Sequence, residues 1–335
     1  YMYQKIGLSL DTSEAGKPSQ DVARSWAEAF GADLTGLYGK GAVDQTARLS
    51  RLTELLPEGY RPGSDEQVPG DTALEADAYA FPVQNFDGSS ASSLVSALAD
   101  ESCDLLILGG RRQGEPGDPV GPLCERVLRT SEVDTLVVKG EFDAGDEGDS
   151  TILVCVDGSP QSYAGLKTAI DLGKKFNKKV EAVGVYDPYL HYTLFNGIVN
   201  VLSAKASAIF KFADQEKLHE EIIDTGLAKI YQAHLEVAQK VAEEEGLTLK
   251  ATLLDGKAFQ KILRHSERTR PWLVVMGRIG VHSDDKMDVG ATTENLLRAV
   301  PTNVLVTSRT YVPSVDVRAH ASVQWTPDAK KKMER

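Results

Sequence analysis

The sequence predicts an α/β protein in which two doubly wound parallel-sheet domains follow one another. Short runs rich in Val, Ile and Leu alternate with segments of helical periodicity, which is typical of a parallel sheet covered by helices on both faces. The same succession of elements occurs twice, with a period of about 145 residues. At 335 residues, the chain is long for one core and comfortable for two.

Each copy opens with a strand that ends in an aspartate and small polar residues. These stretches are 5–13 in the first copy and 151–159 in the second, where a helical pattern and a further strand follow. Later apolar runs, 104–110 and 272–277, end in glycine, and each copy closes with a helix and a last strand. Five strands fit in each copy.

An acidic, glycine-containing segment separates the two copies. Residues 141–149 carry five acids and two glycines and almost no apolar side chain, a composition typical of an exposed linker. We therefore expect domains at 1–140 and 151–310, a linker at 141–150 and a tail at 311–335.

A glycine-punctuated loop follows the fourth strand of the second copy. Gly277 ends the strand, Gly280 and Gly290 follow, and a helical run begins directly afterwards. Glycines let backbone N–H groups approach an anion, and a helix N-terminus adds partial positive charge. The loop therefore has the composition of a phosphate cradle.

Together with the strand ending in Asp157-Gly158-Ser159, this loop resembles the universal stress protein family. In that family the loop reads Gly, two residues, Gly, nine residues, Gly, then Ser or Thr; here the residue after Gly290 is Ala291. The resemblance covers 151–309 closely and 4–140 more loosely. It implies two flavodoxin-like (Rossmann-like) domains with strand order 3-2-1-4-5, forming an internal pseudo-dimer. The ligand would then lie where strands 1 and 4 diverge.

The resemblance also implies an adenine nucleotide as ligand, namely ATP, ADP or AMP. The matching aspartate contacts the nucleotide in the family, and the residue matching Val185 meets adenine through its backbone. The alternative is that Asp157 only caps the following helix. Three loop carboxylates would repel a triphosphate unless a divalent cation such as Mg²⁺ bridges them. They are Asp284, Asp285 and Asp288. The candidate nucleotide-binding residues are Asp157, Gly158, Ser159, Val185, Met276, Gly277, Gly280, Gly290, Ala291, Thr292 and Thr293, where the two threonines could replace the missing hydroxyl.

The first copy has the features of a degenerate site. Asp11 is present, but the glycine intervals after Gly110 differ from the pattern, and Gly121 is followed by Pro122, which has neither hydroxyl nor N–H. We expect no nucleotide there, although Arg111 and Arg112 could still attract an anion.

A helical insertion, 188–245, distinguishes the second copy from the first. Its first helical pattern, 189–212, is apolar nearly all round, and its second, 214–245, carries one apolar stripe that includes His234. A continuous second helix would be about 48 Å long, too long to bury its stripe on one small domain. We therefore expect 188–245 to form a homo-oligomer or to bind a protein partner, with His234 packed at an interface.

Composition and motifs restrict the class of function. A net charge of −12 argues against nucleic-acid binding. Three scattered cysteines and the lack of a signal peptide or an 18-residue apolar run predict a cytoplasmic protein without a membrane span. No arrangement typical of a catalytic site or protein metal site is recognisable; Glu216 and His219 fit a solvated helix face better than a metal site. Slow nucleotide hydrolysis stays open.

The tail holds one further pattern. Residues 323–335 resemble the opening of a short helical module of a protochlorophyllide reductase subunit, and the alternative is a plain terminal helix capped at Thr326. The sequence thus predicts an adenine-nucleotide-binding regulatory or stress-response protein. The competing hypothesis is an interaction scaffold that uses the helical insertion and retains a vestigial nucleotide site.

Overall fold

The computed structural model describes eight stretches of the chain. These are residues 3–12, 16–40, 79–88, 90–110, 120–140, 151–187, 212–280 and 289–313. Four predicted segments lie outside them: the linker 141–150, the apolar helix of the insertion, loop residues 281–288 with their three aspartates, and the tail from 314 with its resemblance to the reductase module.

Strands and helices alternate along both halves of the chain. The first half contains β1 (Lys5–Ser9), α1 (Lys17–Phe30), β2 (Asp33–Lys40), β3 (Val83–Asp87), α3 (Ala91–Asp100), β4 (Leu105–Gly109), α4 (Pro122–Thr130) and β5 (Asp134–Val138). The second contains β6 (Thr151–Cys155), α5 (Pro160–Lys175), β7 (Lys179–Tyr186), α8 (Phe212–Glu244), β8 (Leu249–Asp255), α9 (Ala258–Thr269), β9 (Leu273–Gly277), α10 (Ala291–Ala299) and β10 (Val304–Thr307).

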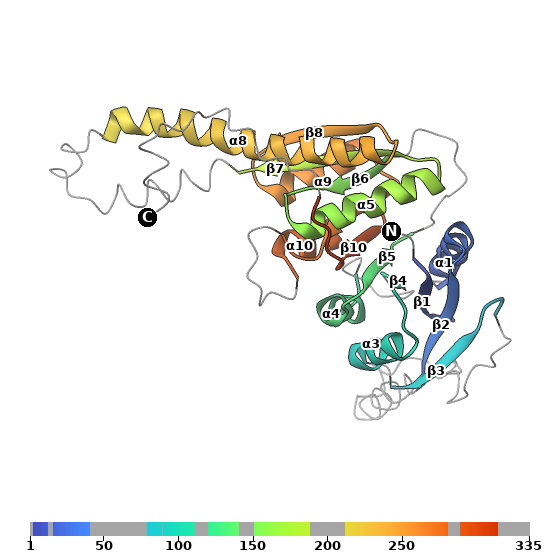
Figure 1. The fold of residues 1–335 in the computed structure, drawn as a ribbon. Coiled ribbons are helices and arrows are strands. Elements are labelled where there is room, and N and C mark those ends of the chain that lie inside the picture. Colours follow the sequence, from blue (N-terminus) through green and yellow to red (C-terminus); the bar gives the residue numbers. More distant parts are fainter. Residues whose placement is uncertain are drawn as a thin grey trace, which may run out of the picture.

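The strands form one ten-stranded sheet in the order β3-β2-β1-β4-β5-β10-β9-β6-β7-β8. Each half is parallel and has the predicted order 3-2-1-4-5, and the two halves join where β5 pairs antiparallel with β10. Helices α1, α5 and α8 cover one face, and α3, α4, α9 and α10 cover the other (Figure 1). The predicted fold class, two flavodoxin-like α/β halves in tandem, is confirmed.

The contact between the halves is pseudo-symmetric. Helices α4 and α10 occupy equivalent places, each with a glutamate in its first turn and an arginine in its last. Arg298 pairs with Glu125 at 2.7 Å, and Arg129 pairs with Glu294 at the same distance. Reciprocal contacts of this kind define an isologous interface, here formed within one chain.

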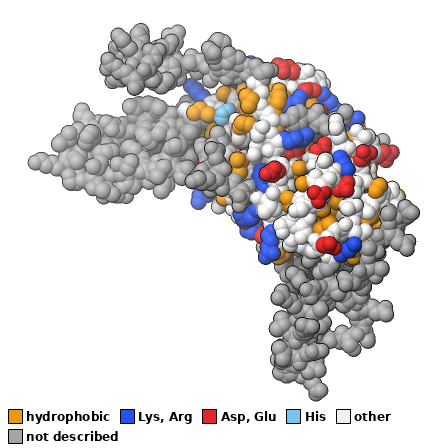
Figure 2. All heavy atoms as spheres, turned by 60° about the horizontal axis from the view of Figure 1, so that its bottom comes forward, with side chains coloured by type: hydrophobic (Ala, Val, Ile, Leu, Met, Phe, Trp, Pro, Cys, Tyr) orange, Lys and Arg blue, Asp and Glu red, His pale blue; other side chains and the backbone are white. Residues whose placement is uncertain are grey.

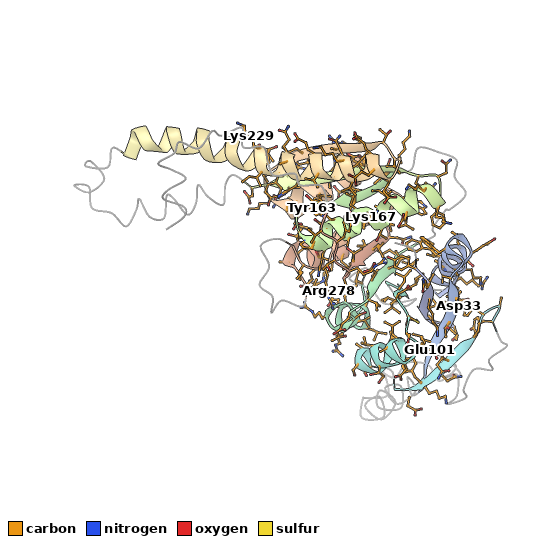
Figure 3. The ribbon with its side chains drawn as sticks, viewed as in Figure 1. Asp33, Glu101, Tyr163, Lys167, Lys229 and Arg278 are labelled. Carbon is orange, nitrogen blue, oxygen red and sulfur yellow. The ribbon has the colours of Figure 1, made fainter. Side chains whose placement is uncertain are left out.

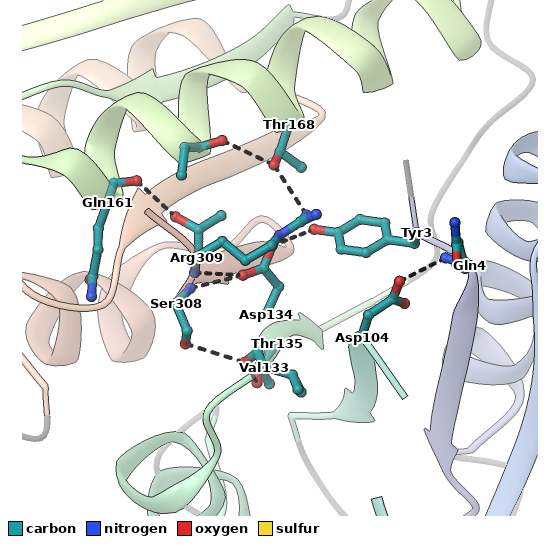
Figure 4. A network of polar contacts seen from close by, with 12 residues as sticks. Tyr3, Gln4, Asp104, Val133, Asp134, Thr135, Gln161, Thr168, Ser308 and Arg309 are labelled. Carbon is teal, nitrogen blue, oxygen red and sulfur yellow. Dashed lines mark hydrogen bonds and ion pairs between the residues drawn. The ribbon is translucent and has the colours of Figure 1, made fainter. Parts of the chain in front are cut away.

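Equivalent residues at the start of β5 and just before β10 extend this symmetry. Asn303 Oδ1 accepts a hydrogen bond from Lys139 N at 2.7 Å, and Asp134 Oδ1 accepts one from Ser308 N at 2.8 Å. Only Asp134 also carries an ion pair, because Arg309 donates to its other oxygen (Figure 4). The interface is therefore symmetric in its backbone but asymmetric in charge.

Basic side chains from each half cap a helix of the other. Arg278 donates to the carbonyl oxygens of Leu128 and Ser131 at the C-terminus of α4, and lies between the two halves in Figure 3. Lys139 donates to the carbonyl oxygens at the end of α10, and its burial lowers the pKa of its ammonium to about 8. Cations at helix C-termini satisfy unpaired carbonyl groups and complement the helix dipole.

Helix α8 packs on its own half with its C-terminal part and extends beyond the sheet with its N-terminal part (Figure 1). Its 33 residues correspond to about 50 Å. Leu235, Ala238 and Val241 are buried against the sheet, whereas Ile230 is 52% exposed. The stripe is thus only partly buried by its own domain, as its length suggested.

No described helix is both long and apolar enough to span a membrane. On the face of the molecule shown in Figure 2, acidic and basic side chains are interspersed among small apolar patches.

Candidate functional site

The carboxyl ends of β6 and β9 meet at one edge of the sheet. The two strands are adjacent and parallel, with Ile152 opposite Leu273 and Val154 opposite Val275. Asp157 follows β6, and Gly277 ends β9. A Cβ atom on Gly280 would lie 2.6 Å from Asp157 Oδ2, so the glycine loop contacts the aspartate directly. The structure therefore brings together the two motifs that the sequence singled out.

Asp157 also organises the turn into α5. Its Oδ1 accepts hydrogen bonds from Ser159 N at 3.0 Å and from Ser159 Oγ at 2.6 Å. The helix cap itself is Ser159, whose Oγ accepts from Ser162 N at 3.2 Å. The capping role considered for Asp157 is thus taken by Ser159, and one carboxylate oxygen shapes the turn while the other faces Gly280.

Gln161, which the sequence analysis did not single out, holds the start of the glycine loop. Its Oε1 accepts a hydrogen bond from Ile279 N at 2.8 Å, and a Cβ on Gly277 would lie 3.1 Å from its Cβ. Thr307 donates to the carbonyl oxygens of Gln161 and Met276. The loop is therefore fixed against the first turn of α5 and the end of β10. No sequence pattern identifies Gln161, because its partner lies far along the chain.

The distal part of the loop leads into α10. Gly290 is the N-cap and provides no side-chain cap, so the first turn offers backbone N–H groups of the kind that bind anions. Thr293 is buried and donates to Gly277 O at 2.9 Å, which commits its hydroxyl to holding the loop. Ala291 and Thr292 are exposed at the helix start. Of the two threonines considered as replacements, Thr292 is the exposed one.

Val185 and Met276 can offer only their backbone groups to a ligand. Both side chains are buried in the core on one face of the sheet. Val183 O accepts from Val156 N, and alternate residues of a strand direct their peptide groups to the same neighbour. The peptide groups of Val185 therefore point in the direction of β6. Because β6 has already ended at Cys155, this space is where a planar base could lie.

Aromatic side chains and a histidine from α5 and α8 complete this region. A Cβ on Gly158 would lie 2.4 to 2.7 Å from three ring atoms of His234. Tyr231 packs edge-on to that ring at 5.5 Å, and Tyr163 donates to His234 O at 3.4 Å. His234 thus packs against the turn after Asp157 and against α5 of its own half. Its position could not be read from the sequence, because it depends on how α8 docks across the sheet.

Burial and the Asp157 charge together set the ionisation of these groups. Burial lowers the pKa of His234, and the nearby Asp157 carboxylate opposes this effect. Burial and the same carboxylate raise the pKa of Tyr163 and that of Cys155 to about 12. Among the described residues, the Asp157 carboxylate thus lies in a partly desolvated environment near the His234 imidazole.

The corresponding region of the first half differs. The Asp11 backbone oxygen accepts a hydrogen bond from Gln20 Nε2 at 2.9 Å and contacts Gly16. Helix α4 begins at Pro122 after an uncapped Gly121. Residues 111–119, which include Arg111 and Arg112, lie outside the described part of the chain.

Both halves match the sequence model of one family, the universal stress protein family, over residues 2–139 and 150–308. The chain therefore belongs to the universal stress protein family. It is 27% identical over 158 residues to universal stress protein MJ0531 of Methanocaldococcus jannaschii, which covers 47% of this chain and 81% of that protein.

Two solved structures share the tandem fold. A universal stress protein from Archaeoglobus fulgidus DSM 4304 has a TM-score of 0.55 at 17% identity and covers 90% of this chain and 97% of its own. The functionally unknown protein PA1789 from Pseudomonas aeruginosa PAO1 has a TM-score of 0.54 at 15% identity, covering 91% and 92%. At these identities the similarity shows the fold alone.

Proposed function

We propose that this universal stress protein is a cytoplasmic regulatory protein that binds an adenine nucleotide in its second half. The nucleotide would lie between Asp157 and the loop that contains Gly277, Gly280 and Gly290. The contact between Asp157 Oδ2 and Gly280 carries the proposal, because it brings the carboxylate and the glycine loop together at the carboxyl ends of adjacent parallel strands, where such folds bind ligands. Membership of the family supports it.

The groups around the crevice suit the parts of a nucleotide. Backbone N–H groups at the start of α10, with the Thr292 hydroxyl, would bind phosphate oxygens. The backbone of Val185 would meet the adenine, and Ser159 would keep Asp157 in place. ATP, ADP and AMP would all present an adenine and at least one phosphate to these groups. For a triphosphate, Mg²⁺ would bridge the phosphates and the loop carboxylates.

A binding titration with a glycine variant tests the proposal. In Gly280→Ala the new Cβ would lie 2.6 Å from Asp157 Oδ2, so loop and carboxylate must separate. Gly140→Ala is the matched control, because a Cβ there meets no atom within 4 Å. At a nucleotide concentration of about a hundred times Kd, binding should stabilise the wild type by about 2.7 kcal/mol. The control should keep this gain, and Gly280→Ala should lose most of it. Melting curves of the wild type that do not respond to ATP, ADP or AMP, with and without Mg²⁺, would reject the proposal.

We further propose that the first half binds no nucleotide. Pro122 lacks an N–H group at the helix position where Ala291 offers one in the second half. Titration calorimetry should therefore give one site per chain, unchanged in Asp11→Ala. A stoichiometry of two would contradict this part of the proposal.

The competing function, an interaction scaffold, is favoured by one observation. Helix α8 extends beyond the sheet and exposes 52% of Ile230. The preceding segment is strongly apolar in sequence, and burying three of its large side chains would contribute about 5–9 kcal/mol, at about 1.5–3 kcal/mol each. Light scattering should then show more than one chain per particle, and Phe195→Asp combined with Ile198→Asp should lower that mass. A monomer that these substitutions destabilise would show instead that the segment folds onto its own chain.

A further inference from the structure

The ring of His234 lies directly over Gly158, next to the aspartate of the crevice. Gly158 has φ +89, in the region that favours glycine, and any Cβ there would overlap the imidazole Cε1, Nε2 and Nδ1 atoms. The glycine therefore allows two features at once: the turn after Asp157 and the close approach of a ring from a helix that is distant in sequence.

His234 is well fixed in this position. Leu235 and Ala238, on the same helix, are buried against the sheet. Tyr231 packs against the imidazole at a ring-centroid distance of 5.5 Å, and the Tyr163 hydroxyl donates to the His234 backbone. Figure 3 shows Tyr163 on α5, in the layer that faces α8. These contacts fix the position of the imidazole ring beside the turn that follows Asp157.

One nitrogen of the His234 ring is buried without a hydrogen-bond partner among the described residues. This atom is Nδ1, which is shielded from solvent. Buried polar groups are nearly always paired, and an unpaired one costs stability, so such an atom beside a crevice indicates a missing partner. Because burial lowers the pKa of His234, the ring is neutral at pH 7 and suits an uncharged hydroxyl or amine better than a phosphate.

We propose that His234 is a specificity-determining residue of the Asp157 crevice, and that its Nδ1 hydrogen-bonds the nucleoside part of the bound nucleotide. This inference rests on the proposed function. Asp157 faces the glycine loop through Oδ2, whereas Gly158 faces His234. The two sides of this turn would therefore contact different parts of the bound nucleotide. The loop takes the phosphates, and α8 reads the uncharged nucleoside.

The test compares polar replacements that differ in where they place their amide. Asparagine puts its amide close to the position of Nδ1, and glutamine puts it close to that of Nε2. His234→Phe keeps a ring without polar atoms, and Lys229→Ala, at an exposed position of α8, is the control. Each full-length variant is titrated with AMP and with ATP by calorimetry, and its melting temperature is measured without ligand.

Loss of one hydrogen bond should weaken binding about tenfold in His234→Phe and His234→Gln, by the same factor for AMP and ATP. His234→Asn should stay within about threefold of the wild type, and Lys229→Ala should equal it. The ligand-free melting temperature of His234→Phe should not fall, because the substitution removes an unpaired polar atom.

Each other outcome overturns a defined claim. A wild type that binds neither AMP nor ATP refutes the proposed function, and this inference with it. A wild type that binds, with His234→Phe and His234→Gln of equal affinity, refutes only the role of His234. If all three His234 variants lose affinity equally and melt lower without ligand, the histidine only packs the crevice wall.

Discussion

Asp134 provides a sharp test of how the two halves hold together. This carboxylate is fully buried and accepts hydrogen bonds from the Tyr3 hydroxyl at 2.8 Å and from the backbone N of Ser308. It also pairs with Arg309 at 2.7 Å, so it joins the first half to the end of the second (Figure 4). In Asp134→Asn an amide N–H₂ group would face the guanidinium, which leaves donors opposite one another.

The expected cost follows from the exposure of the two partners. Breaking a buried ion pair typically costs about 3–5 kcal/mol, because the remaining charge is left uncompensated. The Arg309 side chain is 27% exposed, so water recovers part of its solvation and we expect the lower end, about 3 kcal/mol. For a cooperative unit of this length, that corresponds to roughly 4 °C in melting temperature.

A double-mutant cycle separates the pair from general damage. Urea unfolding, followed through tryptophan fluorescence, reports on this junction because Trp26 of the first half packs 6.1 Å from Phe176 of the second. Combining Asp134→Asn with Arg309→Met should cost less than the sum of the single changes, with a coupling of about 1–3 kcal/mol. Additivity within about 0.5 kcal/mol would refute the reasoning.

The pseudo-equivalent residue gives the matched control. Asn303 is also buried, but the position that corresponds to Arg309 is Gly140 in the first half. Asn303→Asp would therefore bury a charge without an arginine partner, and should destabilise the protein instead of strengthening the interface. Equal stability of Asn303→Asp and the wild type would show that the site tolerates charge regardless of Arg309.

Two further predictions concern titration and thiol reactivity. Hydrogen bonds from Lys167 and Lys174 lower the pKa of Glu245 to about 2. Because the pKa of Glu245 is lower in the folded state, its ionised carboxylate stabilises the fold above the ordinary pKa of 4.5. This stabilisation is lost as the pH falls toward 2. Melting temperatures measured from pH 6 to pH 2 should therefore fall less steeply in Glu245→Gln; parallel curves would contradict this. Burial raises the thiol pKa of Cys124 and of Cys155, so neither should react with a disulfide reagent at pH 8 until urea unfolds the chain. Rapid labelling of the native protein would show that the packing around α4 or β6 opens readily.

Local sequence patterns predicted the element types, and the family resemblance predicted the candidate crevice. Asp157 follows strand 1 and Gly277 ends strand 4, and a parallel sheet of order 3-2-1-4-5 places neighbouring carboxyl ends at one edge. Because this convergence follows from topology, the strand order that the family resemblance implied was enough to predict it. The length of α8 likewise implied that its own domain could not bury the whole stripe.

Which polar group meets which partner was decided by the tertiary structure. Thr293 and Thr292 are indistinguishable in sequence, yet the rotation of α10 buries the first against Gly277 O and exposes the second. Gln161 and His234 join the crevice only because α5 and α8 dock against the loop and the turn. The apolar face of a helix can be read from the sequence, because it depends only on residues that are close along the chain. The opposing atom depends on how separate elements dock, and no local pattern encodes that.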